Sequence, residues 1–246
     1  MLCDKKSGIL TSIGKIEQWR AHGEVYMANK PRILPGTHAP IPAGYIALDL
    51  EHEEEKTTAA VWTFCARAVG VANPRQLTIF ADETHQADLL AQLADFLAAY
   101  PDLPVISWSQ SDIRVLRKAV TEISVENQLI GNLTETRHHT DLLEWTKGAM
   151  ILPTKSLDLK TVAAYFGIAN DVPSMNGSVG SARMRAHRST TNPSVKKGIR
   201  AELIWYVRSD VTLLVGVADH LRSIHDGITP PTGRHEPLHA DDVIYI

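Results

Sequence analysis

The sequence has few cysteines and no long hydrophobic run. Only Cys3 and Cys65 occur among its 246 residues, which excludes a disulfide framework and a cysteine-ligated zinc site and suits a reducing cytoplasm. No apolar run approaches the roughly 18 residues of a membrane helix, and the N-terminus is not followed by the apolar segment of a signal peptide. We therefore expect a cytoplasmic protein without a membrane partner.

Two common hydrolase motifs are also missing. No Gly-x-Ser-x-Gly stretch occurs, so a serine nucleophile has little support. A zinc hydrolase built on His138, His139, Asp141 and distant acidic residues would lack the His-x-x-x-His or cysteine spacing of such sites. The adjacent histidines can instead touch phosphate, tune a metal ligand or lie on a polar surface. Asp141 can support a metal ligand or simply end a strand.

Charge is distributed unevenly along the chain. The net charge of −3 gives no global sign of nucleic-acid binding. Residues 51–55 are strongly acidic, whereas no acidic residue occurs between Pro173 and Ala201. The candidate phosphate contacts in that basic stretch are Arg183, Arg185, Arg188, Lys196, Lys197 and Arg200. The alternative for this stretch is a flexible, solvated surface loop.

The hydrophobic pattern predicts alternating strands and helices. Strands are predicted over residues 44–51, 57–69, 77–80 and 105–108, and within 137–145. Helices are predicted over residues 85–100, after a cap at Ser109 or Ser111 to about residue 120, over 157–166 (capped by Ser156) and over 199–224. A helix or a long loop is expected over 121–136, and a long loop over 169–198. This order predicts an α/β fold with a mixed five-stranded sheet flanked by helices.

One large domain accounts for most of the chain. Residues 1–43 form a predicted N-terminal arm, in which a short helix over 10–22 precedes a proline-rich stretch. Residues 44–226 form the predicted domain, and residues 227–246 a C-terminal tail.

The predicted strand at residues 44–51, Gly-Tyr-Ile-Ala-Leu-Asp-Leu-Glu, contains two acidic residues. Alternation places Ile46, Leu48 and Leu50 on one face and Asp49 and Glu51 on the other. Two carboxylates on one face repel each other unless a cation lies between them or the strand end is solvated. Asp-x-Glu after an apolar strand is therefore a candidate divalent-metal site, although many strands simply end in acidic residues.

Two predicted helices also direct carboxylates toward the core. In the last helix, Asp210 lies three residues after Val207 and four before Leu214 on the apolar face, with Tyr206 one turn earlier. Asp112 shares a face with apolar residues of the helix after the fourth strand. Each aspartate alone has an ordinary explanation, a helix-terminal acid or an ion pair. A shared divalent-metal cluster accounts for all of them at once.

These residues resemble the motifs of the DEDD 3′–5′ exonucleases, tyrosine subtype, a family with the ribonuclease H-like fold. Its first motif, Asp-x-Glu on the first strand, resembles Asp49 and Glu51. Its second motif, an aspartate at the start of the helix after the fourth strand, resembles Asp112. Its third motif, Tyr-x-x-x-Asp on a late helix, resembles Tyr206 and Asp210. The histidine subtype has histidine five residues before that aspartate, where this sequence has tryptophan.

The resemblance extends to a predicted exonuclease domain found alone or behind RecB-like nuclease domains. That domain shares an Asp-Leu pair, which resembles Asp141 and Leu142, and a Ser-Leu-x-Leu-Lys-x-Val-Ala-x-Tyr-x-Gly helix, which resembles residues 156–167. The resemblance covers roughly residues 44–224. Only 43 residues precede Gly44, so we expect no attached RecB-like domain.

The resemblance implies a ribonuclease H-like sheet and a metal-dependent 3′–5′ exonuclease that acts on DNA or RNA at a single-stranded 3′ end. It implies that Asp49, Glu51, Asp112 and Asp210 hold two Mg²⁺ or Mn²⁺ ions about 4 Å apart, while Tyr206 orients the attacking water. The alternative is a catalytically silent ribonuclease H-like module that binds nucleic acid or protein.

Overall fold

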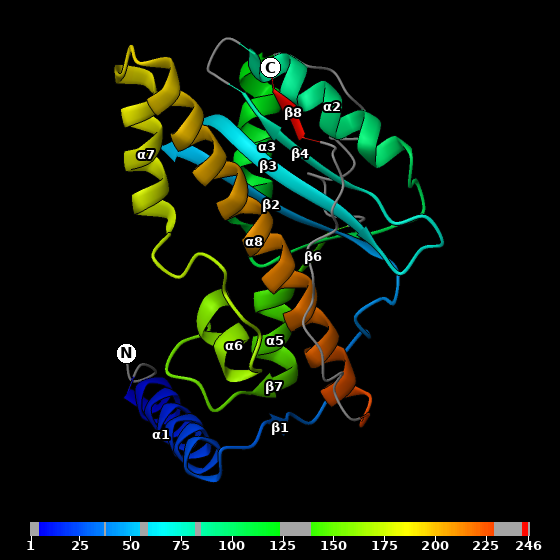
Figure 1. Ribbon diagram of the computed structural model, residues 1–246. Helices are drawn as coiled ribbons and strands as arrows, with labels where there is room; N and C mark the ends of the chain where they lie inside the picture. The colour runs from blue at the N-terminus through cyan, green and yellow to red at the C-terminus, as the bar shows by residue number, and fades with distance from the viewer. Residues whose placement is uncertain are drawn as a thin grey trace.

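A six-stranded mixed sheet forms the centre of the protein (Figure 1). The computed structural model describes residues 5–36, 38–54, 59–81, 85–123, 139–228 and 243–245. In the strand order β6-β5-β2-β3-β4-β8, the members are β2 (Tyr45–Glu54), β3 (Ala59–Val69), β4 (Gln76–Phe80), β5 (Val105–Ser107), β6 (His139–Asp141) and β8 (Val243–Tyr245). The predicted mixed five-stranded sheet, β2 to β6, is confirmed. Strand β8 adds a sixth strand from the segment predicted to be a tail.

The direction and register of the strands place the acidic strand in the middle of the sheet. Strands β2, β3 and β4 pair antiparallel, and β5 and β6 extend the sheet in parallel on the other side of β2. Asp49 lies opposite Cys65, and Glu51 opposite Thr63. The register then shifts between Glu51 and His52. Such irregularities redirect side chains and are frequent next to active sites.

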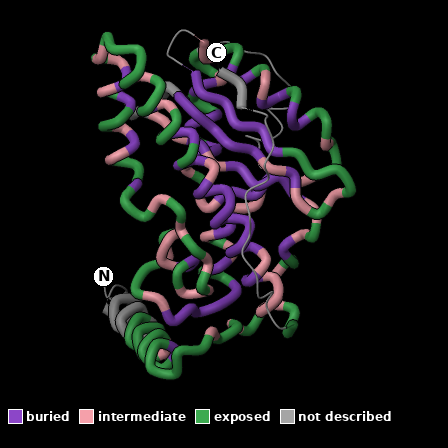
Figure 2. Tube along the Cα trace, in the orientation of Figure 1, coloured by how far each residue is buried: buried purple, intermediate pink, exposed green. Residues whose placement is uncertain are grey.

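Helices cover both faces of the sheet (Figure 1). The helices α2 (Gln86–Ala98) and α3 (Gln110–Ile123) lie on one face, and α7 (Gly177–Ser189) and α8 (Pro193–His225) on the other. The short helices α5 (Leu142–Ala149) and α6 (Leu159–Tyr165) pack against α8. Helices α2 and α3 pack with Leu48 and Leu50 of β2, whereas α8 packs with Tyr45 and Ala47. Because side chains alternate along a strand, Asp49 and Glu51 also face α8. Figure 2 shows that the central strands are buried between these layers.

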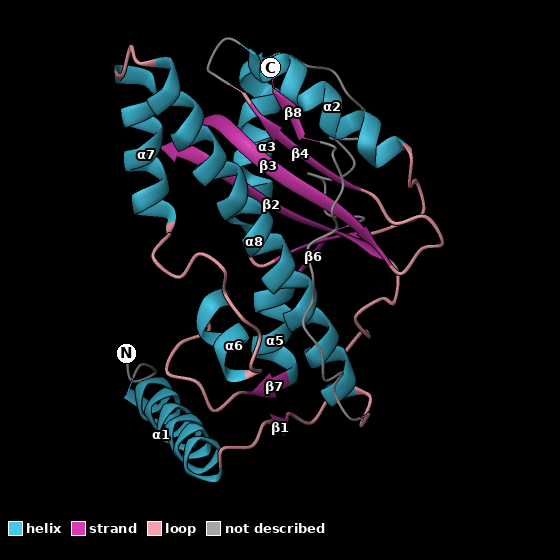
Figure 3. Cartoon of the chain, viewed as in Figure 1, coloured by secondary structure: helices cyan, strands magenta, loops and turns pink. Residues whose placement is uncertain are grey.

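The basic stretch is helical, so the predicted loop over residues 169–198 is wrong for most of its length. Helix α7 begins after Asn176, whose side chain accepts a hydrogen bond from the Val179 amide at 3.0 Å. Helix α8 begins after Asn192 with a proline in its first turn, well before the predicted start at residue 199. Figure 3 shows α7 lying beside the N-terminal half of α8.

Gly180 in the middle of α7 has a packing explanation. A Cβ atom placed on Gly180 would lie 3.4 Å from both Trp62 and Tyr206. The small residue therefore allows α7 to approach β3 and α8 closely. Met184 and His187 bury the same side of the helix, so tertiary packing outweighs the low helix propensity of glycine here.

Two further local predictions differ from the structure. Asp158, rather than Ser156, caps α6, because its carboxylate accepts from the Thr161 amide at 2.9 Å. The N-terminal helix α1 (Lys5–Ala28) is longer than the predicted helix over 10–22, and the proline-rich stretch still forms a short strand, β1 (Arg32–Ile33), that pairs with β7 (Met150–Ile151). Most of the segment 121–136 lies outside the described residues. Within the described part of the chain, no helix is long and apolar enough to cross a membrane.

Candidate active site

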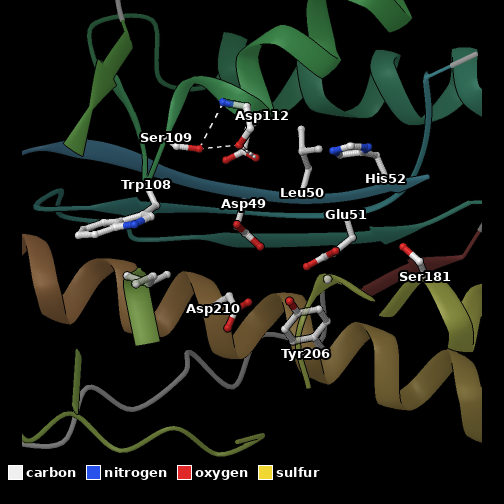
Figure 4. Close-up of a pocket in the computed structure, with 13 residues that line it drawn as sticks. Asp49, Leu50, Glu51, His52, Trp108, Ser109, Asp112, Ser181, Tyr206 and Asp210 are labelled. Carbon is white, nitrogen blue, oxygen red and sulfur yellow. Dashed lines mark hydrogen bonds between the residues drawn. The ribbon is translucent and has the colours of Figure 1, made fainter. Parts of the chain in front are cut away.

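A cavity of about 420 Å³ lies between the end of β2, the turn before α3, and helices α6, α7 and α8. Asp49, Glu51, Asp112, Tyr206 and Asp210 all line it (Figure 4). Its size is in the range of small-molecule sites. The candidate residues of the three sequence motifs therefore lie in one cavity, although they come from elements that are far apart in the sequence.

Three of these residues form a tight carboxylate cluster. One oxygen atom from each of Asp49, Glu51 and Asp210 lies within 4.8 Å of the other two. Figure 4 shows Asp49 and Glu51 projecting from β2 toward Asp210 and Tyr206 on α8. The alternation of β2 supplies the first two carboxylates, and the apolar face of α8 carries the third toward them.

The environment of the cluster disfavours negative charge. Burial raises the pKa of Asp49 well above its usual value, and repulsion by Asp112, Asp210 and Glu51 raises it further. Burial likewise raises the pKa of Glu51 to about 7, opposed by the hydroxyl of Tyr206. It raises the pKa of Asp210 to about 6, opposed mainly by the nearby charge of Lys160. The cluster therefore needs protons or a cation to offset its repulsion.

Asp112 lies in the same cavity but outside the three-carboxylate group found among the described residues. It is in the first turn of α3, is only 7% exposed, and accepts a hydrogen bond from Ser111 Oγ at 3.3 Å. Burial raises its pKa to about 8, with a smaller contribution from Glu51. Asp112 therefore interacts electrostatically with Glu51, although its carboxylate is not one of the three in the cluster.

Tyr206 presents a buried hydroxyl to the carboxylates. The residue is 4% exposed, and burial, followed by repulsion from Glu51, Asp210 and Asp49, raises the pKa of its hydroxyl far above 10. The hydroxyl therefore stays protonated near neutral pH. In this setting Tyr206 is a hydrogen-bond donor and not a base.

Lys160, which was not predicted from the sequence as a site residue, contacts both Asp210 and Tyr206 of α8. Its Nζ atom lies 3.5 Å from Asp210 Oδ1 and 4.6 Å from the centre of the Tyr206 ring. The same ammonium group donates to the Met175 carbonyl at 2.5 Å. The lysine of the Ser-Leu-x-Leu-Lys pattern was the signal available in the sequence. Its partners could not be identified before the docking of α6 against α8 was known.

We expect Lys160 and Asp210 to be energetically coupled, because their ion pair is largely shielded from water. In a double-mutant cycle with Lys160→Met and Asp210→Asn, urea unfolding in EDTA should give a coupling energy of about 0.5–3 kcal/mol. The exposed pair Lys147 and Glu144 is the matched control and should give a smaller coupling. Additive effects of the two substitutions at the first pair would contradict this assignment.

The six basic candidates lie on α7 and the first two turns of α8 and are not a flexible loop. Arg183 is paired with Glu202 at 3.1 Å, and the guanidinium of Arg200 lies 5.3 Å from the centre of the Phe80 ring. Arg185, Arg188, Lys196 and Lys197 complete the set. Only the start of α7 reaches the cavity, through Gly177 and Ser181.

The carboxylate cluster fits a divalent cation. Asp49 Oδ2 is buried and has no hydrogen-bond partner among the described residues. Asp210 Oδ1 is also buried, and the ammonium group of Lys160 lies beside it at the ion-pair distance of 3.5 Å. Buried polar atoms rarely stay without a partner, and carboxylate oxygens are the ligands that Mg²⁺ and Mn²⁺ prefer. Asp49, Glu51 and Asp210 can therefore hold a metal ion.

The mixed sheet flanked by helices, with a carboxylate cluster on its central strand, defines an α/β protein of the ribonuclease H-like class. A family model described as the ribonuclease H superfamily matches residues 46–222, which is more than half of the chain. The chain therefore belongs to the ribonuclease H superfamily. No curated protein and no solved structure gives a significant match. Together, the ribonuclease H-like domain and the acidic cluster indicate nuclease-type activity with metal.

Proposed function

We propose that the protein is a metal-dependent 3′–5′ exonuclease that hydrolyses phosphodiester bonds of DNA or RNA by a two-metal-ion mechanism. The observation that carries this proposal is the cluster of Asp49, Glu51 and Asp210, whose carboxylates converge from β2 and α8 in one cavity. The neighbouring Asp112 and Tyr206 complete the set expected of the tyrosine subtype.

Each residue has a role that follows from its surroundings. Asp49, Glu51 and Asp210 would hold the metal, and Asp112 would contribute from the start of α3. Bound Mg²⁺ or Mn²⁺ would neutralise charge at the scissile phosphate and lower the pKa of water. Tyr206 keeps its proton because of its raised pKa, so it would orient the attacking water through its neutral hydroxyl group. Lys160 would fix Asp210 and the Tyr206 ring from α6.

Helix α7 offers a path for the nucleic-acid backbone beside the cavity. Gly177 and Ser181 line the cavity, and Arg185 lies one turn beyond Ser181 on the same face of the helix. Arg185 is exposed, so among the basic candidates it is placed best to contact a phosphate of a strand that leaves the cavity. Arg183 is the weaker candidate, because it lies two positions after Ser181 and therefore on another face of the helix.

The test is degradation of single-stranded DNA and RNA labelled at the 5′ end, in Mn²⁺, in Mg²⁺ and in EDTA. We expect metal-dependent products that shorten stepwise from the 3′ end and disappear in EDTA. The double variant Asp49→Ala/Asp210→Ala is the negative control and should give no products. The substrate that is degraded faster identifies the preferred sugar.

The same assay separates the alternatives. Products that appear at internal positions from the first time point would identify an endonuclease. If neither strand is cut in any metal but both are bound, the exonuclease assignment is wrong and a catalytically silent binding module remains. Activity with Zn²⁺ alone would favour a different metal chemistry.

A further inference from the structure

A continuous set of hydrogen bonds shapes the turn that carries Asp112. Ser107, at the end of β5, is fully buried, and its hydroxyl donates to the Ser109 carbonyl at 2.6 Å. Ser109 in turn precedes α3, and its Oγ atom accepts from the Ser111 amide at 3.3 Å. The conformation of the turn is therefore set by two serine side chains and not by packing alone.

His139, on the neighbouring strand β6, contacts this turn through the side chain of Ser107. Its Nε2 atom lies 2.8 Å from Ser107 Oγ. Because the single hydroxyl proton of Ser107 is directed to the Ser109 carbonyl, Nε2 must be the donor and Ser107 Oγ the acceptor. The parallel pairing of β5 with β6, with Val105 opposite His139, brings the ring to this position.

The second half of the set leads from Ser109 to the carboxylate. Ser109 Oγ and Ser111 Oγ are 2.5 Å apart, and Ser111 Oγ donates to Asp112 Oδ1 at 3.3 Å. Since the Ser111 proton is directed to Asp112, the Ser109 hydroxyl donates to Ser111. Figure 4 shows Ser109 beside Asp112 at the edge of the cavity. The His139 ring and the hydroxyls of Ser107, Ser109 and Ser111 thus all donate in the direction of Asp112.

We propose that His139 is a positioning residue that, through Ser107, holds the turn between β5 and α3 and thereby orients the carboxylate of Asp112 in the cavity. The inference rests on the proposed function, in which Asp112 contributes to metal binding. It assigns no contact between His139 and substrate or metal. Groups that orient metal ligands in this way typically change metal affinity or activity by about 10- to 100-fold when they are removed.

Two substitutions distinguish orientation from simple packing. His139→Leu keeps much of the side-chain volume but removes the donor, whereas His139→Gln keeps an N–H group at a similar reach. We expect His139→Leu to weaken Mn²⁺ binding or to lower kcat by about 10-fold or more, with little change in KM for the strand. His139→Gln should restore most of the loss. His22→Leu on the exposed helix α1 is the matched control and should leave both quantities unchanged.

Ser107→Ala breaks the same hydrogen bond from the other side and keeps the test informative if His139→Leu does not fold. It should reproduce the defect, and the two substitutions combined should cause little further loss. Wild-type Mn²⁺ affinity and kcat in His139→Leu or Ser107→Ala, or an equal defect in His139→Gln, would overturn the proposal. Titration of Mn²⁺ by calorimetry needs no turnover, so it tests His139 even if the wild-type protein proves not to be an exonuclease.

Discussion

Asp49→Asn should abolish strand degradation without destabilising the metal-free protein. Asparagine has nearly the shape of a protonated aspartate, and burial together with the repulsion of Asp112, Asp210 and Glu51 already raises the pKa of Asp49. Removing its charge therefore relieves repulsion in the cluster. A metal ion held by the cluster would lose a central ligand, however, and a loss of about 4 kcal/mol of transition-state stabilisation corresponds to roughly 1,000-fold in rate.

The two expectations are measured on the same protein. Rates on a 5′-labelled strand in Mn²⁺ should fall at least about 1,000-fold, while urea unfolding in EDTA should give an equal or higher free energy of unfolding. Asp95→Asn, on the exposed side of α2, is the matched control and should change neither quantity. If Asp49→Asn degrades the strand at the wild-type rate, the carboxylate cluster is not the catalytic centre. If it unfolds much more readily in EDTA, Asp49 has a structural role instead.

The parts of this site that could be predicted from the sequence are those that depend on a single element. The two-residue period of β2 places Asp49 and Glu51 on one face, wherever the strand lies in the sheet. The helical period likewise places Asp210 on the buried face of α8, next to Tyr206. An acidic residue on the apolar face of a strand or helix can be recognised from the sequence of that element alone. The sequence therefore indicated that these residues share a polar site.

The parts that could not be predicted depend on how elements pack together. Lys160 follows an apolar pattern in α6, and only the contact of α6 with α8 brings it to Asp210. Helix α7 was missed because glycine and serine predict a loop by their propensity. In the structure Gly180 allows close packing, because it lies against Trp62 and Tyr206. A low helix propensity does not prevent a helix where tertiary contacts require a small residue.

Metal ions should stabilise the protein more at alkaline than at acidic pH. In the metal-free protein the pKa values of Asp210, Glu51 and Asp112 are raised to about 6, 7 and 8, mainly by burial. The native state therefore binds more protons than the unfolded state between about pH 4 and pH 8. Its free energy of unfolding should fall as the pH rises through this range. The reason is that deprotonation leaves buried negative charges, which cost free energy in the folded state but not in the solvated unfolded state.

Metal binding reverses this dependence, because the cation requires the deprotonated carboxylates. At a metal concentration about 100 times Kd, stabilisation should approach about 2.7 kcal/mol, equivalent to roughly 5–10 °C in Tm for a chain of this size. Thermal unfolding in Mn²⁺ and in EDTA should therefore show a difference in Tm that grows from pH 5.5 to pH 8.5. Asp210→Asn should remove most of that difference, whereas Asp95→Asn should preserve it. A difference in Tm that is independent of pH would show that the cation binds away from these carboxylates.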